Sequence, residues 1–102
     1  MLKFSEIQLN ELLEQSKPVV LYFSSLTCGP CIKLSPIMEE LSNEMENINF
    51  VSIKAPYDME PFKTFGVRAV PTMIIFKNNE IVNTITGFKD KNNLSDLFKQ
   101  YV

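Results

Sequence analysis

The chain has 102 residues, of which 45% are hydrophobic, 11% aromatic and 22% charged, and this length and composition predict a single globular domain over residues 1–102. Its formal net charge is −2 at pH 7, so we expect no nucleic-acid partner, because proteins that neutralise many phosphates are normally basic. The sequence has two cysteines, no histidine and no tryptophan. A Ser-His-Asp triad, a Cys-His pair and an imidazole metal ligand are therefore excluded within this chain.

No segment has the pattern of an export signal or of a membrane span. The longest apolar stretch, Val19–Phe23, is far too short to cross a bilayer. We therefore expect a cytoplasmic protein that does not enter a membrane. In a reducing cytosol, paired cysteines are more often catalytic or metal-binding than structural.

The first third of the chain predicts a helix followed by a buried strand. A short strand at Leu2–Phe4 can precede the helix. Ser5 and Gln8 match a capping box, and apolar residues near helical spacing predict a helix from Glu6 to Gln15. Val19–Phe23 is a continuous β-branched and aromatic run, which is typical of a central strand covered on both faces.

The middle of the chain predicts helix, strand and helix again. Apolar residues at steps of three and four predict a helix over Cys31–Glu44, and Pro36 inside it should produce a kink. The partly alternating stretch Ile48–Ile53 predicts a strand. A short irregular helix is expected between Pro56 and Phe65.

The last third predicts a β-hairpin and a final helix. Apolar stretches on both sides of Asn78-Asn79 predict the hairpin, since asparagine tolerates positive φ angles. Asp90 can cap a helix whose apolar residues follow at i, i+3, i+4 and i+7. Helices between strands imply parallel crossovers, and the hairpin adds an antiparallel edge. The expected fold class is α/β.

Both cysteines lie in one short segment, Cys28-Gly29-Pro30-Cys31, after the buried strand and at the start of a helix. A disulfide that closes so small a loop would restrain little of the unfolded chain. The positive end of the helix should lower the pKa of the Cys28 thiol, whereas Cys31, inside the helix, should be more buried and remain a neutral thiol. This predicts a two-step exchange in which Cys28 attacks a substrate disulfide and Cys31 resolves the mixed disulfide.

Several motifs in the same order resemble the thioredoxin family over essentially the whole chain. They are the Cys28–Cys31 segment after the Val19–Phe23 strand, then Val70-Pro71-Thr72, the Phe76–Glu80 hairpin, and Gly87 before the last helix. The resemblance implies a central mixed β-sheet flanked by helices on both faces. It also implies a monomeric protein-disulfide reductase with no bound cofactor and a redox-active Cys28–Cys31 disulfide. Its partners would be oxidised proteins and a thioredoxin reductase that passes on electrons from NADPH.

The resemblance also assigns roles to residues around the cysteines. Pro71 would be cis and face the cysteines, and Val70 beside it would help dock the substrate chain as an added strand. Gly87 would belong to the same docking surface. The active-site loop would contain Thr27, Gly29 and Pro30.

The chain departs from the family at four positions near the site. Thr27 and Ser24 occupy positions where the family usually has tryptophan, so we expect a less aromatic and more polar surface around the sulfur. Tyr22 replaces a buried aspartate that assists proton transfer at the resolving cysteine, and Ser52 aligns with its lysine partner. Loss of both charges is consistent, because losing one would leave the other buried and unpaired. We expect Cys31 to lose its proton to water or to the Tyr22 hydroxyl, and to resolve slowly.

Two alternatives from another functional class remain open at this point. The same fold could be a non-catalytic adaptor that binds partners through the surface around Val70 and Thr27. The cysteine pair could also be half of an iron-sulfur or zinc site that is completed by a second copy, because two thiolates do not fill a four-ligand site in one chain. No metal site is expected within a single chain.

Overall fold

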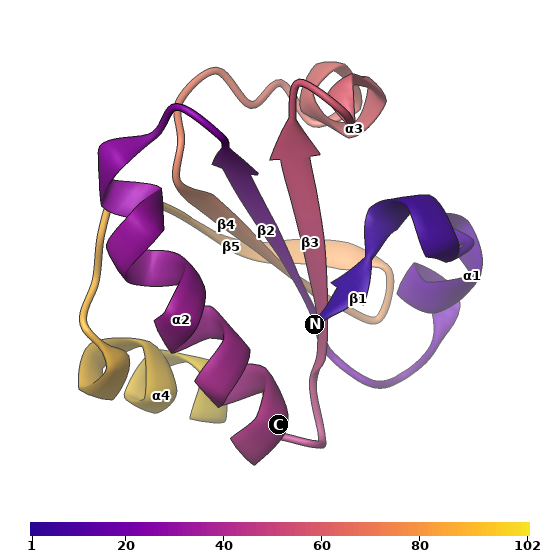
Figure 1. The fold of residues 1–102 in the computed structure, drawn as a ribbon. Helices are drawn as coiled ribbons and strands as arrows, with labels where there is room; N and C mark the ends of the chain where they lie inside the picture. Colours follow the sequence, from indigo (N-terminus) through magenta and orange to yellow (C-terminus); the bar gives the residue numbers. More distant parts are fainter.

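The computed structural model describes all residues from 1 to 102 as a five-stranded mixed sheet with helices on both faces (Figure 1). The central mixed sheet flanked by helices on both faces, which the resemblance implies, is thereby confirmed. None of the helices combines the length and the apolar character needed to cross a membrane. The elements in chain order are β1 (Leu2–Lys3), the 3-10 helix η1 (Phe4–Glu6), α1 (Leu9–Glu14), β2 (Val19–Ser25), α2 (Gly29–Glu44), β3 (Asn49–Ala55), α3 (Met59–Thr64), β4 (Thr72–Lys77), β5 (Glu80–Thr86) and α4 (Lys91–Lys99).

The strands lie in the order β1-β3-β2-β4-β5. Strand β2 is central, as predicted, with β3 parallel on one side and β4 antiparallel on the other. Strand β1 is parallel to β3, and β5 forms the antiparallel hairpin with β4. The expected parallel crossovers are confirmed for the two helical connections that precede β3.

The expected parallel crossover is wrong for the connection from β3 through α3 to β4, because β4 runs antiparallel to β2. The six residues of α3 form a helix about 9 Å long, whereas the seven residues of β3 span about 23 Å. So short a helix cannot carry the chain back along the strand. It stays at the end of β3, as Figure 1 shows, and the chain re-enters the sheet from there.

Alternate residues of β2 face two separate apolar cores. Val20 and Tyr22 belong to the core under α2 and α4, whereas Val19, Leu21 and Phe23 belong to the core under α1 and α3. The second core includes three edge-to-face aromatic contacts, with ring centroids 5.0 to 6.3 Å apart. The strand is covered on both faces, which its continuous apolar run predicts.

The predicted start of the first helix at Glu6 is wrong, because α1 covers Leu9–Glu14 within the predicted range Glu6–Gln15, and Glu6 belongs to the separate 3-10 helix η1. Ile7 lies between them in an extended conformation, with φ −129° and ψ 164°. The capping box is also wrong, since Gln8 is the N-cap of α1 and its side chain makes no capping bond. Partly buried apolar residues from both short helices pack against one core, so their spacing reflects a shared contact surface and not one continuous helix.

Two further local predictions, the hairpin turn and the cap of the last helix, are confirmed. Asn78 and Asn79 turn the hairpin with φ angles of 54° and 64°. The Asp90 side chain accepts a hydrogen bond from the Asn93 N–H at 2.8 Å and caps α4. Helix α2 runs through Pro36 without ending there.

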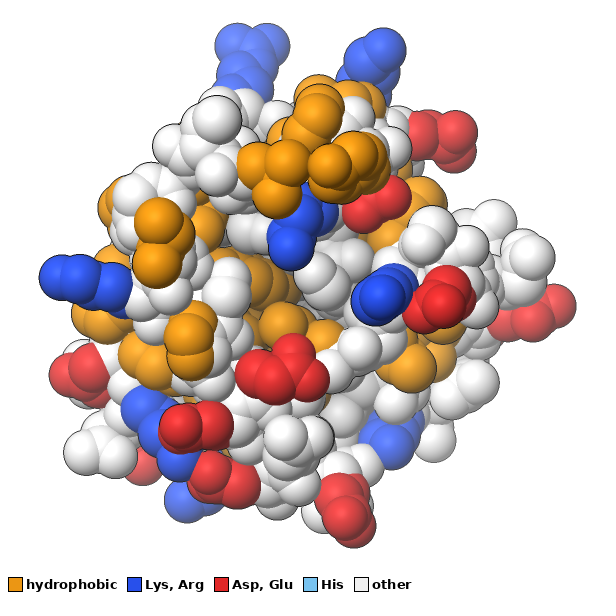
Figure 2. Space-filling view, in the orientation of Figure 1, with side chains coloured by type: hydrophobic (Ala, Val, Ile, Leu, Met, Phe, Trp, Pro, Cys, Tyr) orange, Lys and Arg blue, Asp and Glu red, His pale blue; other side chains and the backbone are white.

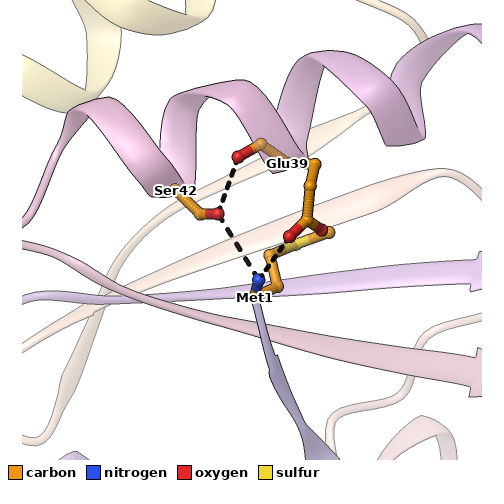
Figure 3. A network of polar contacts seen from close by, with 3 residues as sticks. All are labelled: Met1, Glu39 and Ser42. Carbon is orange, nitrogen blue, oxygen red and sulfur yellow. Dashed lines mark hydrogen bonds and ion pairs between the residues drawn. The ribbon is translucent and has the colours of Figure 1, made fainter.

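The C-terminal half of α2 is tied to the start of the chain. The Met1 ammonium group donates to Glu39 Oε1 at 2.8 Å and to Ser42 Oγ at 3.4 Å (Figure 3). The Ser42 hydroxyl donates in turn to the Glu39 carbonyl oxygen at 2.8 Å. These contacts join the edge of the sheet at β1 to the helix that begins at the cysteines.

The same half of α2 is tied to α4 by one lysine. Lys91 Nζ lies 2.5 Å from Glu44 Oε2 and 3.0 Å from Glu40 Oε2. Hydrogen bonds to Glu44 and then to Glu40 raise the pKa of Lys91 above its usual value. Helix α2 is therefore held on both sides at the end that lies away from the cysteines.

Candidate active site

The two cysteines are placed by the junction between β2 and α2. Cys28 is the N-cap of α2, and Cys31 lies in its first turn. Gly29 and Pro30 are the first two helical residues, where proline is favoured because its missing N–H would be unpaired in any case. Cys28 and Cys31 form a disulfide with their Cα atoms 5.3 Å apart. The two thiolates that a metal-bridging dimer would need are therefore joined to each other here.

The start of α2 directs a backbone donor at one sulfur. The Cys31 N–H donates to Cys28 Sγ at 3.2 Å, and the partial positive charge of the helix start favours negative charge on that sulfur. Cys28 is 8% exposed and Cys31 is 3% exposed. The prediction that Cys31 is the more buried of the two is confirmed.

Hydrogen bonds order the loop that precedes Cys28. Ser25 Oγ accepts from the Thr27 N–H at 3.2 Å and lies 3.1 Å from Thr27 Oγ1. The Cys28 N–H donates to the Ser25 carbonyl oxygen at 3.4 Å, and the Leu26 N–H donates to the Ala55 carbonyl oxygen at 3.3 Å. Hydrogen bonds to the ends of β2 and β3 thus hold the loop that carries the exposed Thr27.

The structure brings the three predicted docking residues together at the same end of the sheet. The Val70–Pro71 bond is cis, as the resemblance implies, and Thr72 next to it pairs with Phe23 near the end of β2. The Gly87 N–H donates to the Pro71 carbonyl oxygen at 2.9 Å. Gly87 has φ +94°, a conformation that side chains rarely adopt.

A second cis bond, Ala55–Pro56, follows directly after β3 at the same end of the sheet. The sequence contains no signal that separates this bond from the usual trans form, because most bonds before proline are trans in folded proteins.

The surface around the sulfur is less polar than expected, because exposed apolar side chains lie near the site. Phe88 is 41% exposed and lines a shallow depression together with Gly29, Pro30 and Lys33. Figure 2 shows a further hydrophobic group over the ends of β2 and β3. The exposed large apolar residues of the loops and helices at this end are Leu26, Ile32, Tyr57, Met59 and Phe88. Sequence reasoning missed Phe88, and its place directly after Gly87 is the signal that could have identified it.

Hydroxyl groups lie beneath the cysteines where the family usually has a buried aspartate and lysine. Tyr22 is buried, and its hydroxyl oxygen lies 2.9 Å from Ser35 Oγ. Burial raises the pKa of Tyr22, and the hydrogen bond with Ser35 opposes this in part. Ser52 is the neighbour of Tyr22 on β3, as the alignment predicts. Ser35 was missed in the sequence, although it follows Cys31 by one helical turn.

The chain contains no group of three or more His, Cys, Asp or Glu side chains arranged to hold a metal ion. The only nucleophilic pair at this end of the sheet is the cysteine pair itself. Its disulfide, the helix start and the adjoining cis-proline loop form one site.

A family model described as Thioredoxin matches residues 1–100 of the chain. The chain belongs to the thioredoxin family. It is 36% identical over 91 residues to the thioredoxin of Bacillus subtilis, covering 87% of this chain and 88% of that protein. It is 35% identical over 88 residues to the thioredoxin of Rickettsia prowazekii, covering 85% and 84%.

Solved structures show the same fold. A point mutant of a thioredoxin from Halobacterium salinarum matches with a TM-score of 0.85 and 29% identity, covering 98% of this chain and 88% of that one. The thioredoxin of Fasciola hepatica matches with a TM-score of 0.84 and 23% identity, covering 92% and 91%. Family membership and the Cys28–Cys31 disulfide together identify this member of the family as a thiol-disulfide oxidoreductase, a protein-disulfide reductase.

Proposed function

We propose that Cys28 is the attacking thiolate and Cys31 the resolving thiol in the reduction of oxidised proteins. The observation that carries this assignment is the hydrogen bond from the Cys31 N–H to Cys28 Sγ. That donor and the helix start stabilise a thiolate at position 28. Cys28 is also the more exposed sulfur, so an incoming disulfide reaches it first.

The exchange balances in two steps. The Cys28 thiolate attacks one sulfur of the substrate disulfide, a mixed disulfide forms, and the other substrate sulfur leaves as a thiolate that takes up a proton. Cys31 then loses its proton and attacks the Cys28 sulfur, which releases the second substrate thiol. Two electrons have passed to the substrate, and the Cys28–Cys31 disulfide of the structure is the product.

Two substitutions test the order of attack with insulin as the disulfide substrate. Cys28→Ser should abolish turnover, because the first covalent bond cannot form. Cys31→Ser should accumulate a covalent mixed disulfide through Cys28, visible as a mass shift that dithiothreitol removes. If Cys28→Ser traps the substrate and Cys31→Ser does not, the two roles are reversed. If neither variant traps it, the proposal fails.

The electron donor proposed for the oxidised pair is a thioredoxin reductase supplied with NADPH. The protein would act in the cytoplasm as a monomer with no bound cofactor, and without nucleic-acid or membrane partners. Family membership supports the reductase and the protein substrates. NADPH consumption with insulin, with the reductase present or omitted, tests donor and activity in one assay, and Cys28→Ser serves as the inactive control.

Substrate docking is proposed along the cis-proline loop, with the Val70 backbone pairing to the substrate as an added strand and Pro71 and Gly87 beside it. The active-site loop of Thr27, Gly29 and Pro30 would cover the other side of the mixed disulfide. The joined loops and the half-buried Val70 support this arrangement. Amide hydrogen exchange in the Cys31→Ser mixed disulfide with a cystine peptide tests it. The Val70 N–H should become protected on trapping, while the N–H of the distant hairpin residue Asn79 should not; equal exchange at Val70 would overturn it.

The proton of Cys31 is proposed to leave through water or through the Tyr22 hydroxyl, with Ser35 next to that hydroxyl. The support is the 2.9 Å contact between the two hydroxyl oxygens, one helical turn from Cys31. Because no buried carboxylate replaces the missing aspartate in this segment, resolution should be slower than in a family member that has one. Stopped-flow measurement of mixed-disulfide resolution in both proteins tests this, and equal rates would overturn it.

A further inference from the structure

One buried polar atom in the structure is left without a partner, and it lies near the cysteines. Ser24 is 2% exposed, and its Oγ is the only buried side-chain nitrogen or oxygen with no hydrogen-bond partner. Leaving a buried hydroxyl unpaired costs free energy, so such a group in a folded protein calls for an explanation. The position of Ser24 on β2, two residues beyond Tyr22, suggests why its hydroxyl is unpaired.

The strand and the helix place Ser24 at the level of Cys31. Side chains alternate along β2, so Ser24 faces α2 as Tyr22 does. Tyr22 meets Ser35 across this gap. Ser24 lies two residues beyond Tyr22, which is about 7 Å along the strand. Cys31 lies four residues before Ser35, which is about 6 Å along the helix. Because β2 and α2 run in opposite directions (Figure 1), both steps lead to the same end of the layer.

The chemistry of the disulfide explains why the hydroxyl is unpaired in this state. In the oxidised pair, Cys31 Sγ is bonded to Cys28 Sγ and carries no proton to donate. Reduction gives Cys31 a thiol or a thiolate, and a hydrogen-bond partner from the protein stabilises such a group at a position that is 3% exposed in the disulfide form. The Tyr22 and Ser35 hydroxyls, one turn deeper, are already paired with each other. Ser24 is the hydroxyl that remains free.

We propose that Ser24 Oγ becomes the hydrogen-bond partner of Cys31 Sγ when the disulfide opens, and that it thereby stabilises the reduced form. The hydroxyl accepts from the Cys31 thiol and donates to the Cys31 thiolate during resolution. This inference rests on dithiol exchange at the cysteine pair, but not on which cysteine attacks or which protein supplies the electrons. Ser24 thus sets how strongly reducing the protein is.

The test is the redox equilibrium of the full chain in glutathione buffers. Two glutathione thiols reduce the disulfide, giving two protein thiols and one glutathione disulfide, so two electrons and two protons are conserved. Ser24→Ala should lower the equilibrium constant for reduction about three- to tenfold, the effect of one hydrogen bond. A tenfold fall makes the protein about 30 mV more reducing. Alkylation followed by mass measurement gives the reduced fraction.

A matched pair separates the hydroxyl from packing. Ser24→Thr and Ser24→Val have nearly the same shape, so Thr should stay close to the wild type while Val shifts as Ala does. Ser95→Ala on α4 controls for the loss of a serine elsewhere. Equal constants for wild type, Ala and Val would mean that the hydroxyl holds a trapped water only, and equal shifts for Thr and Val would mean a packing effect. Either result overturns the proposal.

A second measurement covers variants that fold poorly. Urea unfolding is measured for the oxidised and reduced forms of each soluble variant. The difference between the two free energies of unfolding reports how the substitution changes the redox equilibrium of the folded protein. Losing the hydroxyl should destabilise the reduced form relative to the oxidised one. A relative change of the opposite sign overturns the inference. A protein that forms no intramolecular disulfide in any glutathione buffer would instead contradict the function on which the inference rests.

Discussion

The two faces of the central strand are built for different purposes. Toward α1 and α3, β2 presents Val19, Leu21 and Phe23, which pack in an apolar core with edge-to-face aromatic contacts. Toward α2 it presents an apolar residue first and then two hydroxyl groups, Tyr22 and Ser24, as it approaches the cysteines.

The difference shows how one strand can serve both stability and chemistry. The buried β2 side chains on the α1 and α3 face are all apolar, because they only have to exclude water and fill space. The face toward α2 has two hydroxyl groups near the cysteines, and the partner proposed for Ser24 depends on the redox state of Cys31. Substitutions on the first face should therefore change the free energy of unfolding, and those on the second should change redox behaviour as well.

The largest effect is expected from Phe23→Ala. Phe23 is fully buried and its ring contacts Phe62 and Phe65 edge to face, so its loss leaves a cavity and should lower the free energy of unfolding by about 3–5 kcal/mol. Urea unfolding measures the loss. The glutathione equilibrium of the folded variant should match the wild type. A redox shift as large as that of Ser24→Ala would break the distinction between the two faces.

Tyr22→Phe should have a smaller effect on stability, about 1 kcal/mol. The substitution keeps the ring in the core but removes its hydrogen bond with Ser35. The variant should also resolve the mixed disulfide more slowly if the hydroxyl carries the proton. Comparison with Ser35→Ala, which removes the other side of the bond, sharpens the result. An unchanged resolution rate in Tyr22→Phe would assign the proton to water alone.

Alkaline pH should lower the free energy of unfolding of the wild type more than that of the Tyr22→Phe variant. Burial raises the pKa of Tyr22 above its usual value of 10.0, so the unfolded chain loses this proton first. The contribution of Tyr22 to the free energy of unfolding is fully present below pH 10, and it falls as the pH rises from 10 toward the pKa of Tyr22 in the folded state. Urea midpoints measured at about pH 8 and about pH 11, on either side of the usual tyrosine pKa, test this. If the urea midpoints of the two proteins depend on pH in the same way, the Tyr22 hydroxyl is not desolvated in the folded state.

The smallest effect is expected from Lys91→Met. Lys91 bonds Glu44 and Glu40 on the surface between α2 and α4, and exposed ion pairs contribute little and are screened by salt. The raised pKa of Lys91 means that any stabilisation is present below its unfolded pKa and is lost as the pH rises through the folded value. Melting temperatures in low and high salt should differ more for the wild type than for the variant.

Local patterns predicted most of the fold and the cysteine site. The continuous apolar run of β2, the Asn78-Asn79 turn and the Asp90 cap each depend on neighbours in the chain, and the structure confirms them. The first helix begins later than predicted because Ile7 lies extended between η1 and α1, although apolar residues from both meet one core. Periodicity reports which residues are buried, but it does not report that the backbone stays helical between them.

Other features that sequence reasoning missed depend on partners distant in the chain. The unpaired state of Ser24 depends on what every neighbouring layer offers to its hydroxyl, and the contact between Tyr22 and Ser35 depends on how α2 lies over the sheet. The orientation of β4 failed for a related reason. It follows from the length of α3 relative to β3, not from the order of helices and strands.

The bond from the Gly87 N–H to the Pro71 carbonyl oxygen has a consequence for binding entropy. It fastens the segment that carries Phe88 to the cis-proline loop before any partner arrives. A docking chain would therefore meet two loops that are already fixed relative to each other. Since ordering of loops opposes association, most of the conformational freedom lost on docking would be the partner's own.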